Sequence, residues 1–143
     1  MLLGYFDKQL SIIKRLCLEI TAIDLSFYNN RFVFALKTQQ FYTAFEELFK
    51  QIAKSFENHI ENLDEILVRM NIEVPTVRPK IISKDSLALL EKLRAFTEFF
   101  DHAYDRELDE EELQLLNDKI GDLSPLLEQD LLTFRDYIKK LSV

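Results

Sequence analysis

Apolar residues recur every three or four positions along most of the chain, a spacing that places them on one face of an α-helix. The first series predicts a long N-terminal helix followed by a turn at Asn29 and Asn30; its members are Phe6, Leu10, Ile13, Leu16, Ile20, Ile23 and Phe27. A second series, from Phe41 to Phe56, predicts another long helix. A weaker series, from Ile60 to Met70, predicts a third.

Two prolines separate this N-terminal part from the rest of the chain. Pro75 and Pro79 disfavour helical backbone in the residues that precede them, so the segment around them is predicted to be an extended connection. The next helix is expected to be capped by Ser83 or Asp85 and to carry its apolar stripe as far as Ala103.

Capping signals predict two further helices in the C-terminal part. Asp109 and Glu112 have the spacing of a capping box, which predicts a short helix that ends at Gly121. The pair Ser124–Pro125 has the pattern of an N-cap followed by proline at the first helical position. A last helix is therefore expected from there to Leu141.

Length and composition agree with one helical domain. The chain of 143 residues has the commonest size of a single domain and holds no linker long enough to divide it, so residues 1–143 are predicted to form one domain. Only two Gly and three Pro are present, which leaves little room for the turns of an all-β fold. We therefore predict an all-α bundle of five or six helices.

The sequence also suggests a cellular environment. No stretch approaches the roughly 20 uninterrupted apolar residues of a membrane span. The first residues lack the pattern of a secretory signal, so a cytoplasmic protein is expected. Cys17, the one cysteine, lies between Leu16 and Leu18 in the pattern of the first helix and is predicted to be a buried thiol.

Charge is distributed unevenly. From Arg69 to Arg94 the chain has six basic and three acidic residues, a local charge of +3. From Ala95 to Asp130 it has twelve acidic and two basic residues, a local charge of −10. A phosphate-rich partner is attracted to the first segment and repelled by the second, although an acidic run is also the ordinary composition of a solvated face.

Several kinds of catalytic centre are excluded by the residues available. The Glu-x-x-His motif of di-iron bundles is absent, because Phe56 and Phe99 stand three residues before His59 and His102. Two histidines without ligand spacing do not make a zinc site, and two glycines do not make a phosphate-binding loop. Neither a metal nor a cofactor is expected.

The remaining candidate for chemistry is the stretch from Glu98 to Tyr104. Glu98 and His102 are one helical turn apart and are expected to pair, and Thr97 and Asp101 have the same spacing. Histidine, tyrosine and a nearby arginine are the residue types that a metal-free ribonuclease needs, for proton transfer and for stabilising charge on the phosphate. The structural alternative is a helix-terminal His102 whose only role is to pair with Glu98.

Several segments, in order, resemble the HepT-like branch of the HEPN superfamily. These helical domains include the ribonuclease toxins of toxin–antitoxin pairs whose antitoxin is a nucleotidyltransferase. The resemblance is strongest over residues 41–141 and rests on Phe41-Tyr42, Phe45-Glu46, Ile52-Ala53, the run from Arg78 to Ser83, His102-Ala103-Tyr104, Glu107-Leu108-Asp109, Phe134 and Leu141.

The resemblance implies a metal-independent endoribonuclease, acting as a homodimer with its site in a cleft between subunits. The family signature is an Arg, four to six residues, then His-x-Tyr, and it places the His on His102 and the Tyr on Tyr104. In some pairs the antitoxin adenylylates that tyrosine, so Tyr104 is also a candidate modification site. The signature Arg is absent, because the three positions that allow it hold Ala95, Phe96 and Thr97.

Three hypotheses follow. The first is a HepT-like domain whose ribonuclease activity is weakened or lost with the signature Arg. The second is an active ribonuclease that uses His102 and Tyr104, with Arg94 as the substitute cation and with Arg78 and Lys80 binding RNA. The third is a helical interaction module whose acidic face docks a basic partner. A homodimer and a nucleotidyltransferase antitoxin are the expected partners under the first two.

Overall fold

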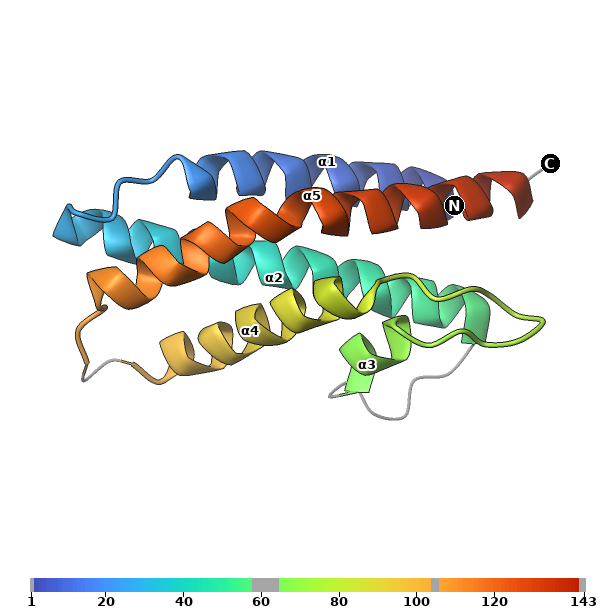
Figure 1. Ribbon diagram of the computed structural model, residues 1–143. Coiled ribbons are helices and arrows are strands. Elements are labelled where there is room, and N and C mark those ends of the chain that lie inside the picture. Colours follow the sequence, from blue (N-terminus) through green and yellow to red (C-terminus); the bar gives the residue numbers. More distant parts are fainter. Residues whose placement is uncertain (1, 58–64, 104–105, 142–143) are drawn as a thin grey trace.

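The computed structural model describes residues 2–57, 65–103 and 106–141, and this part of the chain forms five α-helices (Figure 1). Their bounds are α1 Leu2–Thr21, α2 Tyr28–Glu57, α3 Ile66–Met70, α4 Lys84–Asp101 and α5 Glu110–Leu141. The four long helices alternate in direction, and α1 and α4 each pack against both α2 and α5 (Figure 1). The predicted all-α bundle is confirmed. Among the helices described, none combines the length and apolar character needed to cross a bilayer.

The core lies between the four long helices and is rich in aromatic rings. The stripes predicted for α1 and α2 are buried from Phe6 to Ile20 and from Phe41 to Ile52. The largest enclosed side chains are phenylalanines: Phe6, Phe34, Phe41, Phe45, Phe49 and Phe134. Because each such ring buries a large apolar area, these phenylalanines supply much of the hydrophobic stabilisation of the bundle.

The predicted boundary between the first two helices is wrong by several residues. Helix α1 ends at Thr21, Phe27 is 63% exposed, and Asn29 and Asn30 lie in the first turn of α2. The chain reverses at Asp24, whose carboxylate accepts hydrogen bonds from the backbone N–H and the hydroxyl of Ser26, at 3.0 and 2.6 Å. Such a side-chain-to-backbone turn competes with helix formation. The interruption between α1 and α2 is therefore caused by the turn at Asp24 and not by the two asparagines.

The C-terminal part forms one helix instead of the two predicted. Helix α5 opens as expected, with the Glu112 N–H donating to Asp109 Oδ2 at 3.0 Å, but it continues through Gly121 and Pro125. The proline ring removes one backbone hydrogen bond. The apolar stripe keeps its helical register across the proline, with buried side chains at Leu113, Ile120, Leu127, Leu131, Phe134 and Ile138. Packing of this continuous stripe therefore outweighs the local stop signals.

Helix α4 is fixed at its N-terminus by a shared carboxylate. Ser83 is the N-cap, and its hydroxyl oxygen accepts from the Ser86 N–H at 3.3 Å, which selects Ser83 over Asp85 as the cap. Asp130 of α5 accepts from the Ser83 N–H and hydroxyl at 2.8 Å each and from the Ser86 hydroxyl at 2.6 Å. These bonds hold the start of α4 against α5. The third predicted helix appears as α3, and its expected members Ile60 and Leu63 lie outside the described residues.

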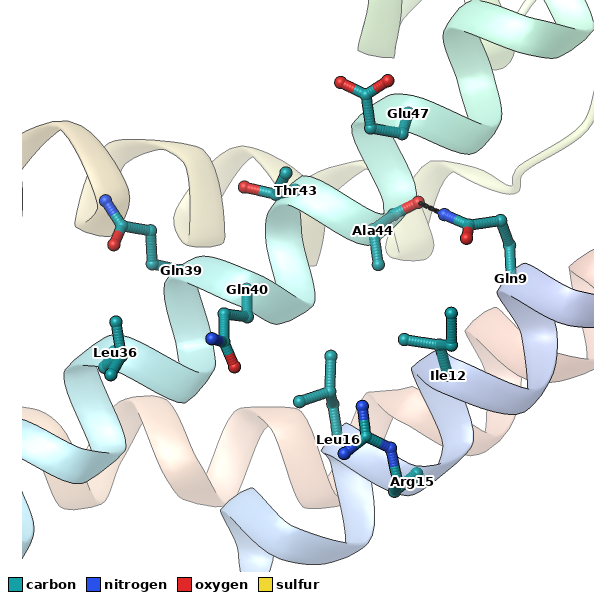
Figure 2. A pocket seen from close by; sticks show the side chains of 10 residues that line it. All are labelled: Gln9, Ile12, Arg15, Leu16, Leu36, Gln39, Gln40, Thr43, Ala44 and Glu47. Carbon is teal, nitrogen blue, oxygen red and sulfur yellow. Dashed lines mark hydrogen bonds between the residues drawn. The ribbon is translucent and has the colours of Figure 1, made fainter.

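A groove of about 580 Å³ runs between α1 and α2. Figure 2 shows Gln9 reaching across from α1, where its amide donates to the Ala44 carbonyl oxygen at 3.0 Å. Ile12, Leu16 and Leu36 line the groove together with glutamine and threonine side chains (Figure 2). Arg15 and Glu47 complete the lining, and no histidine, cysteine or tyrosine is among the described residues that line the groove.

Candidate functional site

His102 is the C-cap of α4 and lies at an open cleft of about 500 Å³. Its backbone N–H donates to the Phe99 carbonyl oxygen at 3.1 Å, which completes the last turn of the helix, and its side chain is exposed. The cleft is lined by Ala95, Glu98, Phe99, His102 and Arg106. The predicted site residues Glu98 and His102 are thus brought to one cleft.

The predicted pairs within this stretch do not form. Glu98 is ion-paired with Arg94, one turn earlier on α4, with 3.4 Å between Arg94 Nε and Glu98 Oε1. Asp101 accepts from the side-chain amide of Gln39 on α2, at 2.5 Å. Within the described part of the chain, no hydrogen bond or ion pair involves the His102 imidazole. The ring is therefore accessible to a ligand. The structural alternative, in which His102 pairs with Glu98, is not what the structure shows.

Arg94, the proposed substitute cation, does not line the cleft. It lies two turns before His102 on α4, and its guanidinium contacts Glu98, whose carboxylate does line the cleft. A partly exposed pair of this kind contributes little to stability, and only its carboxylate lines the cleft. The geometry gives no support to Arg94 as the phosphate-binding group of a single subunit.

A buried tyrosine lies beside this ion pair. Tyr42 of α2 donates its hydroxyl to Glu46 Oε2 at 3.1 Å, and Glu46 is also paired with Lys50 at 3.3 Å. Burial raises the pKa of Tyr42 well above its usual range, with Glu46 adding to the effect, Arg94 opposing it and Glu98 reinforcing it. The phenol therefore stays protonated at neutral pH and acts as a donor that ties polar groups of α2 together.

Tyr104, the second residue of the signature, lies outside the described residues. Its predicted catalytic role and its predicted adenylylation stay predictions.

Arg78 is not available to bind RNA, which corrects the expectation from the sequence. Its side chain is 0% exposed and its Nη2 is ion-paired with Glu57 at 2.9 Å. Its Nη1 donates to the carbonyl oxygens of Ile72 and Pro79, at 2.8 and 3.0 Å. Because a buried guanidinium needs such partners, Arg78 serves to close the connection between α3 and α4.

Lys80 is exposed but distant from the cleft. It precedes the N-terminus of α4, whereas His102 follows the C-terminus of that helix. An α-helix of this length spans about 27 Å, at 1.5 Å a residue. Lys80, which was expected to bind RNA, therefore lies at the opposite end of α4 from His102.

Arg106 is the cleft residue that the sequence pattern did not indicate, because the family signature places its cation before the histidine. A backbone hydrogen bond of 3.1 Å from the Arg106 N–H to the Ala103 carbonyl oxygen closes a turn directly after α4. Arg106 lines the His102 cleft together with residues of the last two turns of α4. Spacing along the sequence alone does not reveal such a turn.

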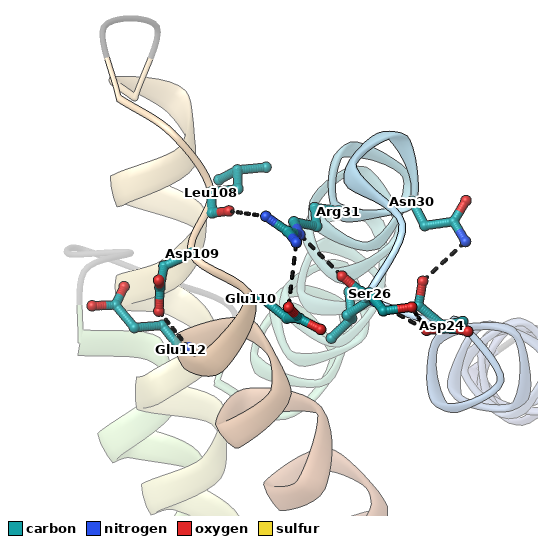
Figure 3. A network of polar contacts seen from close by, with 9 residues as sticks. Asp24, Ser26, Asn30, Arg31, Leu108, Asp109, Glu110 and Glu112 are labelled. Carbon is teal, nitrogen blue, oxygen red and sulfur yellow. Dashed lines mark hydrogen bonds and ion pairs between the residues drawn. The ribbon is translucent and has the colours of Figure 1, made fainter.

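The far end of the same connection is held by Arg31 of α2 (Figure 3). The Arg31 guanidinium donates to the carbonyl oxygen of Leu108 at 3.3 Å, to Glu110 at 3.4 Å and to the carbonyl oxygen of Leu25 at 2.9 Å. Leu108 is buried, which adds an apolar anchor at the same point. The connection that carries Arg106 is therefore fixed both where it leaves α4 and where it enters α5.

The residues around the cleft offer no metal site. In the part of the chain that the structure describes, no group of three or more His, Cys, Asp or Glu side chains is placed to hold a metal ion. What the cleft does offer is an imidazole, a guanidinium, a carboxylate and an aromatic ring, a set suited to proton transfer and to contact with an anionic, aromatic ligand.

A family model described as HepT-like protein matches residues 33–138. The chain belongs to the HepT-like family. The match covers most of α2 and all of α3 and α4, together with α5 up to its last residues, so the His102 cleft lies inside the HepT-like segment and the whole of α1 precedes the match. No curated protein and no solved structure matches the sequence significantly.

The structure distinguishes the three positions that the HepT-like signature allows for its arginine. Ala95 is exposed and lines the cleft. Phe96 packs against the core, with its ring centroid 6.2 Å from that of Phe34, and the hydroxyl oxygen of Thr97 is buried without a hydrogen-bond partner. Of the three, Ala95 is the position from which an arginine side chain would enter the His102 cleft.

Proposed function

We propose that this HepT-like domain is a relative of metal-independent endoribonuclease toxins in which RNA cleavage at the His102 cleft is strongly weakened. The observation that carries the proposal is the lining of the cleft. Ala95 occupies the position where the signature arginine would reach His102, and the Glu98 carboxylate lies in the same cleft.

The chemistry follows from the exposed imidazole. His102 takes the proton of a ribose 2′-hydroxyl, and the 2′-oxygen attacks the neighbouring phosphorus. A 2′,3′-cyclic phosphate forms, the bond to the 5′-oxygen breaks, and the leaving oxygen takes up a proton from Tyr104 or from solvent. Negative charge grows on the phosphate during this step.

The missing cation sets the magnitude of the weakening. Removing one preorganised group that stabilises such charge typically costs about 3 to 4 kcal/mol, a factor of about 10² to 10³ in rate. The Glu98 carboxylate, which lines the cleft, adds repulsion toward the phosphate, and its ion pair with Arg94 offsets this only in part. The residues of the cleft therefore best support slow RNA cleavage at a His102 side chain that RNA can still reach.

The partners proposed with this function come from the family. We propose that the domain acts as a homodimer, with the His102 clefts of two subunits facing a shared space, and that a nucleotidyltransferase antitoxin is its partner, with Tyr104 as the acceptor of the nucleotide. Sedimentation of the purified protein tests the dimer. Incubation with the partner enzyme and labelled ATP, beside Tyr104→Phe, tests the modification.

The function itself is tested by cleavage of a fluorescent oligoribonucleotide in the presence of EDTA. We expect slow cleavage by the wild type that is lost in His102→Ala. Lys119→Ala is the matched control, because Lys119 is an exposed cation of the acidic segment outside the cleft. Rapid cleavage by the wild type, or slow cleavage that persists in His102→Ala, would contradict the proposal.

A further inference from the structure

The cleft contains an arginine, Arg106, that is not part of the family signature. Arg106 comes after His102 in the sequence, whereas the signature arginine comes before the histidine. We propose that Arg106 and Phe99 form a nucleotide subsite beside His102, in which Arg106 binds a phosphate and Phe99 stacks on the base. The inference rests on the proposed function, since it concerns the same cleft, and it names the ligand that the cleft holds: a nucleotide with a single phosphate.

Arg106 follows helix α4 with its backbone N–H hydrogen-bonded, and its exposed side chain lines the cleft. The turn closed by the hydrogen bond between the Arg106 N–H and the Ala103 carbonyl oxygen sets its backbone against the end of α4. The buried Leu108, two residues later, is held by Arg31 (Figure 3). No ion pair of Arg106 is present in the described part of the chain, so its guanidinium retains the planar set of donors that matches a phosphate.

Phe99 has the placement of a stacking platform. Its side chain is 37% exposed, although it is a large apolar residue, and it lines the cleft. Behind it lies Phe96, with ring centroids 6.3 Å apart, and Phe96 in turn stacks on Phe100 at 6.3 Å. A partly exposed ring that packs against another aromatic ring is well suited to stack on a base, and such stacking tolerates any base.

His102 lies between these two groups along the chain, three residues after Phe99 and four before Arg106. All three residues line the same cleft, so the proposal places the ribose and phosphate of a nucleoside 3′-phosphate beside the imidazole. The Glu98 carboxylate in the same cleft disfavours additional negative charge. The subsite is expected to bind a monophosphate more tightly than the corresponding triphosphate.

The test uses the imidazole of His102 as the reporter and adenosine 3′-monophosphate as the probe. In NMR titrations of the full-length protein, the His102 ring signals, assigned by their loss in His102→Ala, are expected to shift and saturate. Arg106→Ala is expected to raise the dissociation constant at least tenfold, and Arg106→Lys to restore part of the affinity. Phe99→Ala is expected to weaken binding about tenfold, whereas Lys119→Ala changes it less than twofold.

The experiments distinguish a failure of the proposed nucleotide subsite from a failure of the proposed ribonuclease function. If adenosine 3′-monophosphate leaves the His102 signals of the wild type unchanged, or if Arg106→Ala and Arg106→Gln both bind like the wild type, the subsite is refuted, whatever the result of the cleavage assay. If the nucleotide binds in an Arg106-dependent manner while cleavage is absent or independent of His102, the subsite stands and the ribonuclease proposal fails. Amide spectra of each variant confirm that it is folded.

Discussion

Replacing Ala95 with arginine is predicted to raise the rate of RNA cleavage. Ala95→Arg recreates the family spacing, an arginine and six residues before His102, at the one signature position that is exposed and lines the cleft. The helix tolerates the change, because alanine and arginine have similar helix propensities and Glu91, one turn earlier, is an opposite charge. A gain of function is a stronger test than a loss, since an unfolded variant cannot produce it.

The magnitude follows from the charge that the substitution restores. A complete, preorganised cation is worth about 3 to 4 kcal/mol in the transition state, a factor of about 10² to 10³. The Glu98 carboxylate in the cleft competes for the new guanidinium, so only part of this gain is expected. We predict an increase of about tenfold to a hundredfold in the single-turnover rate constant.

The assay compares Ala95→Arg with two variants that separate charge from bulk and position. Ala95→Gln adds a polar side chain without charge and is expected to cleave like the wild type. Thr97→Arg, at the alternative signature spacing, places the arginine where the hydroxyl oxygen of Thr97 is buried, and it is expected to destabilise the fold rather than activate the cleft. The reasoning is refuted if Ala95→Arg is no faster than Ala95→Gln, or if adding His102→Ala to Ala95→Arg leaves the gain intact.

Three further predictions concern the framework around the cleft. Arg31→Ala removes the hydrogen bonds to the connection after α4 and is expected to lower the free energy of unfolding by about 1 to 3 kcal/mol; hydrogen exchange at the Leu108 amide should rise more than in the core, and an unchanged exchange rate there would contradict the anchoring role. Arg78→Ala removes the buried cation paired with Glu57, which keeps its second ion pair with Arg69 at 2.7 Å, and it leaves the carbonyl oxygens of Ile72 and Pro79 without their donor; it is expected to cost about 1 to 3 kcal/mol in chemical denaturation, against less than about 0.5 kcal/mol for the exposed Lys80→Ala. The pKa of Tyr42 is raised in the folded state, so its contribution is present below the unfolded pKa of about 10 and is lost as the pH rises above that value. Wild type should therefore lose stability in alkali faster than Tyr42→Phe, and parallel pH profiles would exclude this contribution.

The fold was predictable because helical periodicity records which side chains face the core. Most members of the stripes predicted for α1, α2 and α5 are buried, with Phe27 and Leu141 as exposed exceptions, and the capping roles of Ser83 and Asp109 are confirmed. Element boundaries were less predictable, because they depend on competition between local and tertiary effects. Pro125 is a strong local stop signal, yet the stripe on both sides of it packs as one surface and the helix continues.

The candidate site was predicted in part. His102 lies at an open cleft, but its expected pairing with Glu98 does not form. Glu98 pairs instead with Arg94, which precedes it by four residues, just as His102 follows it by four. The spacing along the sequence allows Glu98 to pair with either residue and does not show which pair forms. Arg106 enters the cleft through a turn, and Arg78 is withdrawn from the surface by a buried carboxylate 21 residues away. Neither contact can be predicted from the three- and four-residue spacing that identifies the helices.

The chemistry assigned to His102 is tested most directly by the ends of the RNA fragments that the wild type produces in EDTA. Mass spectrometry of the products is predicted to show 2′,3′-cyclic phosphates and 5′-hydroxyls, formed slowly by the wild type, not by His102→Ala, and not from an oligonucleotide with a 2′-deoxyribose at the scissile position. Products with 3′-hydroxyl and 5′-phosphate ends, or cyclic phosphates formed equally by His102→Ala, would contradict the account.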